Sequence, residues 1–351
     1  MRRRRWQLLA AATGMALTAA ALAGCGGSAS GAEGPAAQSI TLYNGQHEQT
    51  TNALVAGFEK ETGITVNQRD DDEDTLADEI VAEGSHSPAD VIFTENSQVE
   101  EFLQSKGLLA KVDSSTLSHD PAADNSPQGD WVGVSARVSV IIYNPALISE
   151  SQLPTSIMQL ADSKYAGKLA IAPEETDFQP IITAVDHAYG QAATLTWLKA
   201  LKANAGSHVY PDNETIADEV NRGQVAFGVV NQYYWYRMRA EIGIGNTKAR
   251  ITHFAAYNPG YVEDISGAAI LKSSTHNAAA QKFLAYLVST QAQEIIGDPS
   301  KSISFEYPIA DGVTGQAGET PLNQLKPYPI TLPELGTGTL AISLMRQAGW
   351  L

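Results

Sequence analysis

The chain has 351 residues, and 39 acidic against 23 basic side chains give it a formal net charge of −16 at neutral pH. A balance this acidic argues against a protein that binds nucleic acid or that uses a basic patch on anionic lipid. Cys25 is the only cysteine, which excludes an internal disulfide and a thiolate metal site.

The N-terminus has the order of an export signal. Four arginines at positions 2–5 precede an Ala-rich apolar stretch over residues 8–22, which is typical of a signal peptide rather than of a spanning helix. The sequence LAGC at 22–25 resembles the lipobox of bacterial lipoproteins, which implies that Cys25 is lipidated and becomes the first mature residue. We therefore expect an exported protein with a flexible tether over residues 25–38, held at the outer face of the cell membrane by its lipid anchor alone.

Removal of residues 1–24 leaves 351 − 24 = 327 residues, enough for two globular lobes. The first part of this chain alternates predicted strands with predicted helices. In chain order these are a strand over 39–44, a helix over 48–61 ended by Gly63, a strand from Ile64, a helix over 76–82 and a strand over 89–93. This order predicts an α/β fold with a parallel sheet, and it places the turns at 44–47 and 94–96 together at the carboxyl ends of the strands.

The second part of the chain predicts another α/β lobe. Apolar runs over 138–143, 169–172 and 225–230 are typical of buried strands, and helices are expected over 181–189 and 192–202. A strand over 268–271 and a helix over 277–287 indicate a return to the first lobe. Residues 321–335 are expected to form a loop, and residues 340–349 a closing helix.

The acidic run RDDDED at 69–74 has the alternate spacing of a calcium loop, but it lacks two defining residues of that motif. Its sixth position is Thr75 rather than Gly, and its twelfth is Val81 rather than Glu. The run is therefore interpreted as a solvated loop with carboxylates at the start of the next helix.

Four side chains that suit a hard trivalent cation stand at the ends of predicted strands: His47, Glu95, Tyr233 and Tyr234. Ferric iron prefers anionic oxygen ligands, and binding through tyrosinate is established chemistry. Because tyrosine is largely protonated at neutral pH, such binding releases protons. Composition alone leaves the alternative open that the adjacent tyrosines pack in the core and that His47 is a surface histidine.

Several separated segments, in order, resemble the bacterial ferric-ion-binding proteins, which are the substrate-binding components of iron(III) ABC importers. These are YNGQHEQ (43–49), GSHSPADVIFTEN (84–96), LKALK (198–202), NQYYW (231–235), SGAAILKSS (266–274) and EYP (306–308). The resemblance implies a two-lobe periplasmic-binding-protein-like fold of type II, with a hinge and an interlobe ligand cleft. The expected N-lobe covers 39–137 plus 266–313, and the expected C-lobe covers 138–265 plus 314–351. By resemblance, His47 and Glu95 are the N-lobe iron ligands, and Tyr233 and Tyr234 the C-lobe ligands.

The same resemblance implies a small anion, phosphate or carbonate, in the coordination shell, but the loop expected to hold it reads PEETDF (173–178). The carboxylates of this loop would repel phosphate. The open iron position is then filled by Glu175, by Asp177 or by water. The alternative is that the two carboxylates point to solvent. The remaining candidate residues of this subsite are Thr176 in the loop, Asn96 in place of a frequent Gln, Arg137 as a possible partner of a loop carboxylate, and Asn231, which either holds the anion or caps a helix. A second basic position near the anion is occupied by Ser139.

The function that this resemblance implies is capture of Fe(III) in the cleft and delivery to an ABC importer, with its permease and ATPase subunits as partners. The protein is expected to act as a monomer. It is not expected to be an enzyme, because the sequence has no nucleophile–base pair and no metalloprotease spacing. A protein of the same fold that binds a phosphonate, polyamine or thiamine is the alternative, and a secreted metalloenzyme is the more distant one.

Overall fold

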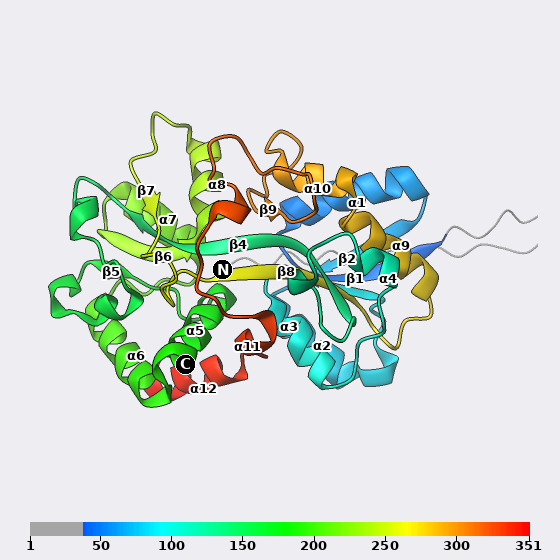
Figure 1. Ribbon diagram of the computed structural model, residues 1–351, viewed down its shortest axis with the longest axis horizontal. Coiled ribbons are helices and arrows are strands. Elements are labelled where there is room, and N and C mark those ends of the chain that lie inside the picture. Colours follow the sequence, from blue (N-terminus) through cyan, green and yellow to red (C-terminus); the bar gives the residue numbers. More distant parts are fainter. Residues whose placement is uncertain (1–37) are drawn as a thin grey trace, which may run out of the picture. The chain divides into compact units, whose positions relative to one another are not determined.

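The computed structural model describes residues 38–351, and these form one nine-stranded sheet with helices packed on it (Figure 1). The predicted signal peptide, the lipidation site Cys25 and nearly all of the predicted tether lie outside the described residues. The strands are β1 (Ser39–Gly45), β2 (Thr65–Asp70), β3 (Val91–Thr94), β4 (Trp131–Tyr143), β5 (Leu169–Ala170), β6 (Phe227–Asn231), β7 (Arg250–Thr252), β8 (Glu263–Ile270) and β9 (Tyr307–Pro308).

The helices include every one that the sequence predicts, together with several that it does not. They are α1 (Glu48–Thr62), α2 (Glu73–Glu83), α3 (Ser97–Ser105), α4 (Ser114–Leu117), α5 (Gln179–Tyr189), α6 (Gln191–Ala205), α7 (Asn213–Arg222), α8 (Gln232–Ile242), α9 (Asn277–Leu287), α10 (Thr290–Gly297), α11 (Leu332–Leu335) and α12 (Thr339–Ala348). Gly63 ends α1 in the left-handed conformation at φ 69°, which glycine adopts without steric cost.

The first three strands form the predicted parallel sheet. β1 pairs in parallel with β2 and with β3, and Gly45 at the end of β1 lies opposite Thr94 at the end of β3. This register is what brings the turns after β1 and β3 to the same edge of the sheet. One face of this part is covered by a hydrophobic cluster in which Phe58 of α1 packs edge-on against Phe283 of α9 at 5.0 Å between ring centroids.

The long strand β4 connects the two parts of the sheet, and all of its residues are buried. Its residues from Trp131 to Val138 pair with β8, whereas those from Ser139 to Tyr143 pair with β6. β8 also pairs with β3, which confirms the predicted return of the chain to the first part of the sheet. Figure 1 shows β4 and β8 side by side, with β6 and β7 toward one side and β1 and β2 toward the other.

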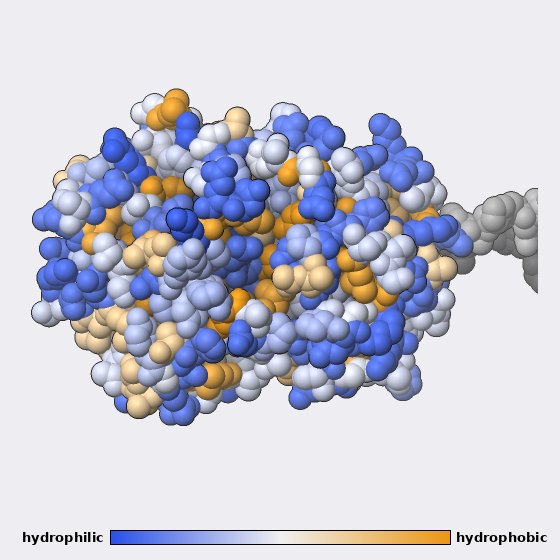
Figure 2. All heavy atoms as spheres, viewed as in Figure 1, coloured by the Kyte–Doolittle hydropathy of each residue, from blue (hydrophilic) through white to orange (hydrophobic). Residues whose placement is uncertain are grey.

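In the second part of the sheet, α7 and α8 pack against β4 and β6, α6 packs against β5, and the closing helix α12 packs against α5 and α6. Trp197 of α6 is buried, and its indole nitrogen donates to the carbonyl of Ile157 at 3.0 Å. Hydrophilic residues occupy most of the face drawn in Figure 2, and hydrophobic residues appear there in small separate groups. Within residues 38–351, none of the helices has the length and apolar character that crossing a membrane requires.

Candidate metal centre

The four predicted metal ligands all lie at or near helix N-termini. His47 is the N-cap of α1, Glu95 immediately precedes the N-cap of α3, and Tyr233 and Tyr234 are in the first turn of α8. The free N–H groups of a helix N-terminus carry partial positive charge, so the arrangement favours negatively charged oxygen at the point where the helices meet. The first two positions follow parallel neighbouring strands, and α8 starts where β6 leaves its pairing with β4.

These four side chains converge in the structure. The Nε2 atom of His47 lies 3.3 Å from Oε1 of Glu95, and the Tyr233 hydroxyl donates to Oε2 of Glu95 at 3.1 Å. The His47 ring lies edge-on to both phenol rings, with centroid distances of 5.3 Å to Tyr233 and 5.8 Å to Tyr234. Nε2 of His47 is buried and has no hydrogen-bond partner among the described residues, so this nitrogen is not committed to another protein group.

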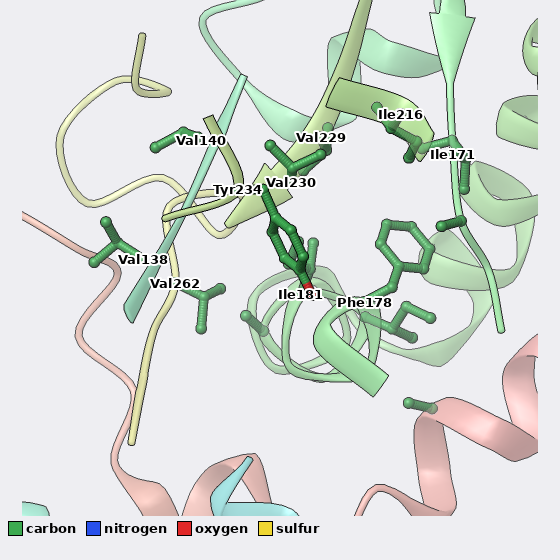
Figure 3. Close-up of a cluster of buried hydrophobic side chains, with 14 of the residues drawn as sticks. Val138, Val140, Ile171, Phe178, Ile181, Ile216, Val229, Val230, Tyr234 and Val262 are labelled. Atoms are coloured by element: carbon green, nitrogen blue, oxygen red, sulfur yellow. The ribbon is translucent and has the colours of Figure 1, made fainter. Parts of the chain in front are cut away.

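The two tyrosines also belong to the hydrophobic core. Figure 3 shows the Tyr234 ring among side chains that include Val138, Val230 and Val262, while its hydroxyl points toward the start of the segment that carries Phe178 and Ile181. Core packing and a polar role are therefore not exclusive alternatives for these residues. The apolar contacts fix the rings, and the fixed rings direct the phenol oxygens.

The loop at 173–178 supplies carboxylates to both phenols. The Tyr233 hydroxyl is 3.1 Å from Oδ2 of Asp177, and the Tyr234 hydroxyl donates to Oε1 of Glu175 at 3.1 Å. Asp177 is buried and Glu175 is half-buried, whereas Glu174 is exposed. Of the two predicted orientations for this loop, the structure has Asp177 and Glu175 facing the tyrosines and Glu174 facing solvent.

Two arginines lie beside the site, and only one of them was a predicted site residue. Nε of Arg137 in β4 is 3.9 Å from Oδ1 of Asp177, which is the pairing considered from the sequence. Arg237, which sequence reasoning missed, lies over the Tyr233 ring at 4.6 Å from its centroid and donates through Nε to the carbonyl of Ile303 at 3.0 Å. Its position four residues after Tyr233 on α8 is the only signal in the sequence that could have indicated this stacking.

The prediction that the acidic run at 69–74 is solvated is wrong for Glu73. This side chain is 3% exposed, and its carboxylate accepts hydrogen bonds from the backbone N–H groups of Glu95 at 2.7 Å and Asn96 at 3.1 Å. The side-chain amide of Asn96 donates both to Glu73 at 2.8 Å and to the hydroxyl of Thr176 at 3.1 Å. Glu73 is therefore the acceptor that holds the turn carrying Glu95, a role that a run of acidic letters does not reveal.

The structure also describes the surroundings of two further positions considered for the anion subsite, Asn231 and Ser139. Asn231 is the N-cap residue of α8, but its side chain makes no capping hydrogen bond, so of its two predicted roles the capping alternative is wrong. Ser139, which occupies the second basic position, donates through Oγ to the carbonyl of Gly260 at 2.8 Å and accepts from the N–H of Val262 at 2.9 Å. It therefore fixes the backbone next to the strand switch and brings no charge to the site.

Burial sets the protonation states of the unliganded site. It raises the pKa of both Tyr233 and Tyr234 well above the usual value, and the negative charge of Asp177 adds to this effect. Burial likewise raises the pKa of Glu95, with Asp177 again contributing, and raises that of Glu175 to about 8. Burial and the positive charges of Arg237 and Arg137 lower the pKa of His47, which is therefore a neutral imidazole at neutral pH.

An acidic cavity of about 660 Å³ leads to this cluster. Nine of its sixteen lining residues are Asp or Glu, and neither Lys nor Arg is among these described lining residues. Such a surface attracts cations and repels anions. No cluster of three or more His, Cys, Asp and Glu side chains with metal-holding geometry occurs in residues 38–351, and the candidate centre combines two such side chains with two phenols.

Comparison with known proteins relates this geometry to solute transport. The family described as bacterial extracellular solute-binding protein matches residues 44–294. The Fe(3+)-binding periplasmic protein of Serratia marcescens is 36% identical over 314 residues, covering 90% of this chain and 91% of the relative. The major ferric iron-binding protein of Neisseria meningitidis serogroup B is 32% identical over 317 residues, covering 90% of this chain and 94% of the relative.

The solved structure of iron-bound HitA from Pseudomonas aeruginosa is 38% identical and superimposes with a TM-score of 0.84, covering 89% of this chain and 99% of that one. This likeness confirms the predicted α/β two-lobe fold of periplasmic binding proteins. The resemblance to ferric-ion-binding proteins that the sequence motifs predict is confirmed as well. The chain belongs to the bacterial extracellular solute-binding proteins, and ferric-ion-binding proteins are among its relatives.

Proposed function

We propose that this chain captures Fe(III) and delivers it to an ABC importer. The observation that supports this most directly is the convergence of donor atoms on the Glu95 carboxylate: Nε2 of His47 lies 3.3 Å from its Oε1 atom, and the Tyr233 hydroxyl lies 3.1 Å from its Oε2 atom. An octahedral ion with bonds of about 2.0 Å holds neighbouring ligand atoms about 3 Å apart. Two phenols, a carboxylate and a neutral imidazole are a donor set that suits ferric iron.

Binding is proposed to close the cleft between two lobes. The N-lobe is assigned to 39–137 plus 266–313 and the C-lobe to 138–265 plus 314–351, in keeping with the change of β4 pairing after Val138. His47 and Glu95 then come from the N-lobe, and Tyr233 and Tyr234 from the C-lobe. Since iron contacts all four only in the closed state, it shifts the population toward that state.

The proposed setting is the outer face of the cell membrane, with the lipid on Cys25 as the anchor and the permease and ATPase subunits of an importer as partners. The importer would recognise the closed form, so that only the loaded protein docks productively. The role is transport rather than catalysis, in keeping with the solute-binding family to which the chain belongs. The protein is proposed to act as a monomer.

The test is a titration of the full chain with ferric citrate, followed by visible absorption in buffers with and without phosphate. A phenolate-to-iron charge-transfer band that saturates at one equivalent in either buffer is the expected result. No band in either buffer would overturn the proposal, and competition binding with a polyamine, thiamine and a phosphonate would then identify the ligand class.

A further inference from the structure

The segment from Ile303 to Glu306, which we call the strap, contacts both of the elements that carry the proposed ligand pairs. It directly precedes β9, which pairs with β4 at Ser135 and Ala136 (Figure 1). All of the strap except Ile303 is buried. It therefore lies beside the stretch of β4 where the two parts of the sheet join.

Gln232, the first residue of α8, ties the tyrosine pair to β4 and to the strap. Along one edge of β4, pairing with β9 ends at Ala136 and pairing with β6 begins at Ser139. In the interval, the side-chain carbonyl of Gln232 accepts from the backbone N–H of Val138 at 2.9 Å, and its amide donates to the carbonyl of Phe305 at 3.3 Å. Gln232 is 1% exposed, so one buried side chain closes the interval in the strand pairing immediately before the tyrosines.

Two further contacts fasten α8 to the strap. Nε of Arg237 donates to the carbonyls of Ile303 at 3.0 Å and Ser304 at 3.2 Å. The Tyr236 ring stacks on Phe305 with 6.1 Å between ring centroids and 13° between ring planes. In the proposed division of the chain the strap belongs to the N-lobe and α8 to the C-lobe, so these contacts cross from one lobe to the other.

The last residue of the strap contacts the turn that carries His47. The carboxylate of Glu306 accepts from Nε2 of Gln46 at 3.5 Å, and the hydroxyl of Ser135 also donates to it. Gln46 is 3% exposed, its side-chain carbonyl accepts from the backbone N–H of His47 at 2.7 Å, and its amide also donates to the hydroxyl of Ser266 at 2.8 Å. A buried glutamine thus precedes each ligand position in the chain, and both glutamines contact the strap.

The backbone of the strap is strained at Phe305. Its φ of 58° lies in the left-handed region, which bulky side chains rarely adopt. Such a conformation costs free energy and persists only where the surroundings fix it. The hydrogen bond from Gln232 and the stacking of Tyr236 are contacts of this kind. Loss of the hydrogen bond should therefore let the strap relax.

We infer that Gln232 and Gln46 are positioning residues, which hold the tyrosine pair and His47 at a fixed separation through the strap. This inference rests on the proposed function and specifies it, because it names groups that set iron affinity without touching iron. Metal affinity depends on ligands that are in place before the ion arrives. Loss of either amide should weaken iron binding although all four proposed ligands are kept.

The first measurement compares Gln232→Met and Gln46→Met with the unchanged full chain. Methionine keeps the length and the neutrality of the side chain and removes its hydrogen bonds. Iron is supplied as ferric nitrilotriacetate, and binding is followed by the charge-transfer band. We expect each variant to lose about 10–100-fold in iron affinity. The band of the saturated protein should keep its position, because both phenols remain.

The double variant tests whether the two glutamines act through the same segment. Changes at separate sites multiply their effects on affinity, whereas changes within one network do not. Once one amide is lost and the strap is released, the second loss has less to disturb. We therefore expect the double variant to lose at least about 3-fold less than the product of the two single losses. Two independent defects of folding would not produce this coupling.

Asn204→Leu is the matched control for a buried amide. The Asn204 amide donates to the carbonyls of Leu160 at 2.7 Å and Asp162 at 2.9 Å. This variant is expected to unfold at a lower temperature and to bind iron as the unchanged chain does. Thermal unfolding of every variant without iron measures the cost to the fold separately.

Three results would overturn the inference. They are unchanged iron affinity in either glutamine variant, single losses that multiply fully in the double variant, and an equal loss of affinity in Asn204→Leu. Each of them leaves the proposed function intact, because the unchanged chain still binds iron. If the unchanged chain gives no charge-transfer band, the proposed function itself fails, and this result is distinct from all three.

Discussion

The hydroxyl of Tyr233 donates to the carboxylate of Glu95 across 138 residues of sequence, at 3.1 Å. This contact joins a helix that starts after β6 to a turn that follows β3, on either side of the point where β4 changes its partner. Without iron, the shared proton holds the two groups together. In the proposed iron complex these two groups are both ligands, so the contact seen without iron already places them next to each other.

Mutation should separate the role of the phenol oxygens in iron binding from the role of the phenol rings in core packing. Tyr233→Phe and Tyr234→Phe keep the ring that packs in the core and remove the oxygen that faces the carboxylates. We expect each variant to lose iron affinity by about 100-fold or more, beyond what outer-shell changes cost, while melting without iron at nearly the same temperature. Visible titration and circular dichroism measure the two properties.

Tyr236→Phe is the matched control for these variants, because Tyr236 lies on the same helix and stacks on Phe305 instead of facing the site. An equal loss of iron affinity in Tyr236→Phe, or unchanged affinity in both site variants, would contradict the assigned ligands.

Iron binding should strengthen as the pH rises. Burial raises the pKa of Tyr233 and Tyr234, so both phenols are protonated in the apo protein at neutral pH and must lose a proton to bind iron. We expect iron to release about two protons from the phenols and a further one from Glu95, whose pKa burial also raises, measured in a weakly buffered titration between pH 5.5 and 7.5. Tyr233→Phe should release fewer protons, and binding that is independent of pH over this range would contradict phenolate ligation.

Local patterns predict the first part of the fold well. Polar and apolar residues alternate in β1, and β3 is an apolar run. Parallel pairing brings the ends of the two strands together, so the sequence alone places His47 and Glu95 at one edge of the sheet. The sequence predicts only the apolar end of β8, at 268–271, because the first residues of the strand, EDIS, have weak strand propensity. Pairing with β4 in the middle of the sheet overrides that preference.

The groups that support the ligands could not be predicted in the same way. Glu73 accepts a hydrogen bond from the backbone of Glu95, 22 positions away, and the side-chain amide of Asn213 donates to Asp177, 36 positions away. The guanidinium of Arg237 lies over the ring of Tyr233, one helical turn before it. Composition indicated a solvated acidic run around Glu73 because it reports charge and not the partner of that charge. Helix α8, with few aliphatic residues, has no clear apolar stripe and is specified by the burial of Tyr233 and Tyr234 in the core.

Glu73 should control iron affinity without touching iron. Glu73→Ala removes the acceptor for three hydrogen bonds that hold the turn at Glu95 and Asn96. We expect iron affinity to fall by about 10–100-fold, with the charge-transfer band unchanged in position at saturation because all proposed ligands remain. Glu73→Gln, which keeps one acceptor, should lose less.

Asp72→Asn is the control for this effect, since Asp72 is exposed in the same acidic run and lines the same cavity. If it weakens iron binding as much as Glu73→Ala does, the cause is the charge of the cavity and not the support of the turn.

A buried carboxyl outside the metal centre should make the apo protein less stable at high pH. Glu100 of α3 is fully buried, accepts from the hydroxyl of Thr94 at 2.5 Å, and has a second oxygen, Oε2, without a partner among the described residues. Burial raises its pKa from the usual 4.5 to about 8. A carboxyl whose pKa is raised by folding stabilises the folded state while it is protonated, and this contribution is lost as the pH rises from about 4.5 through about 8. We therefore expect Glu100→Gln, which stays neutral, to raise the urea midpoint clearly more at pH 8.5 than at pH 5.5, where only the first part of this contribution has been lost. Glu241→Gln is the control, because Glu241 is exposed on α8, and it should change neither midpoint. Equal effects of Glu100→Gln at the two pH values would show that the Glu100 carboxyl does not titrate as its burial requires.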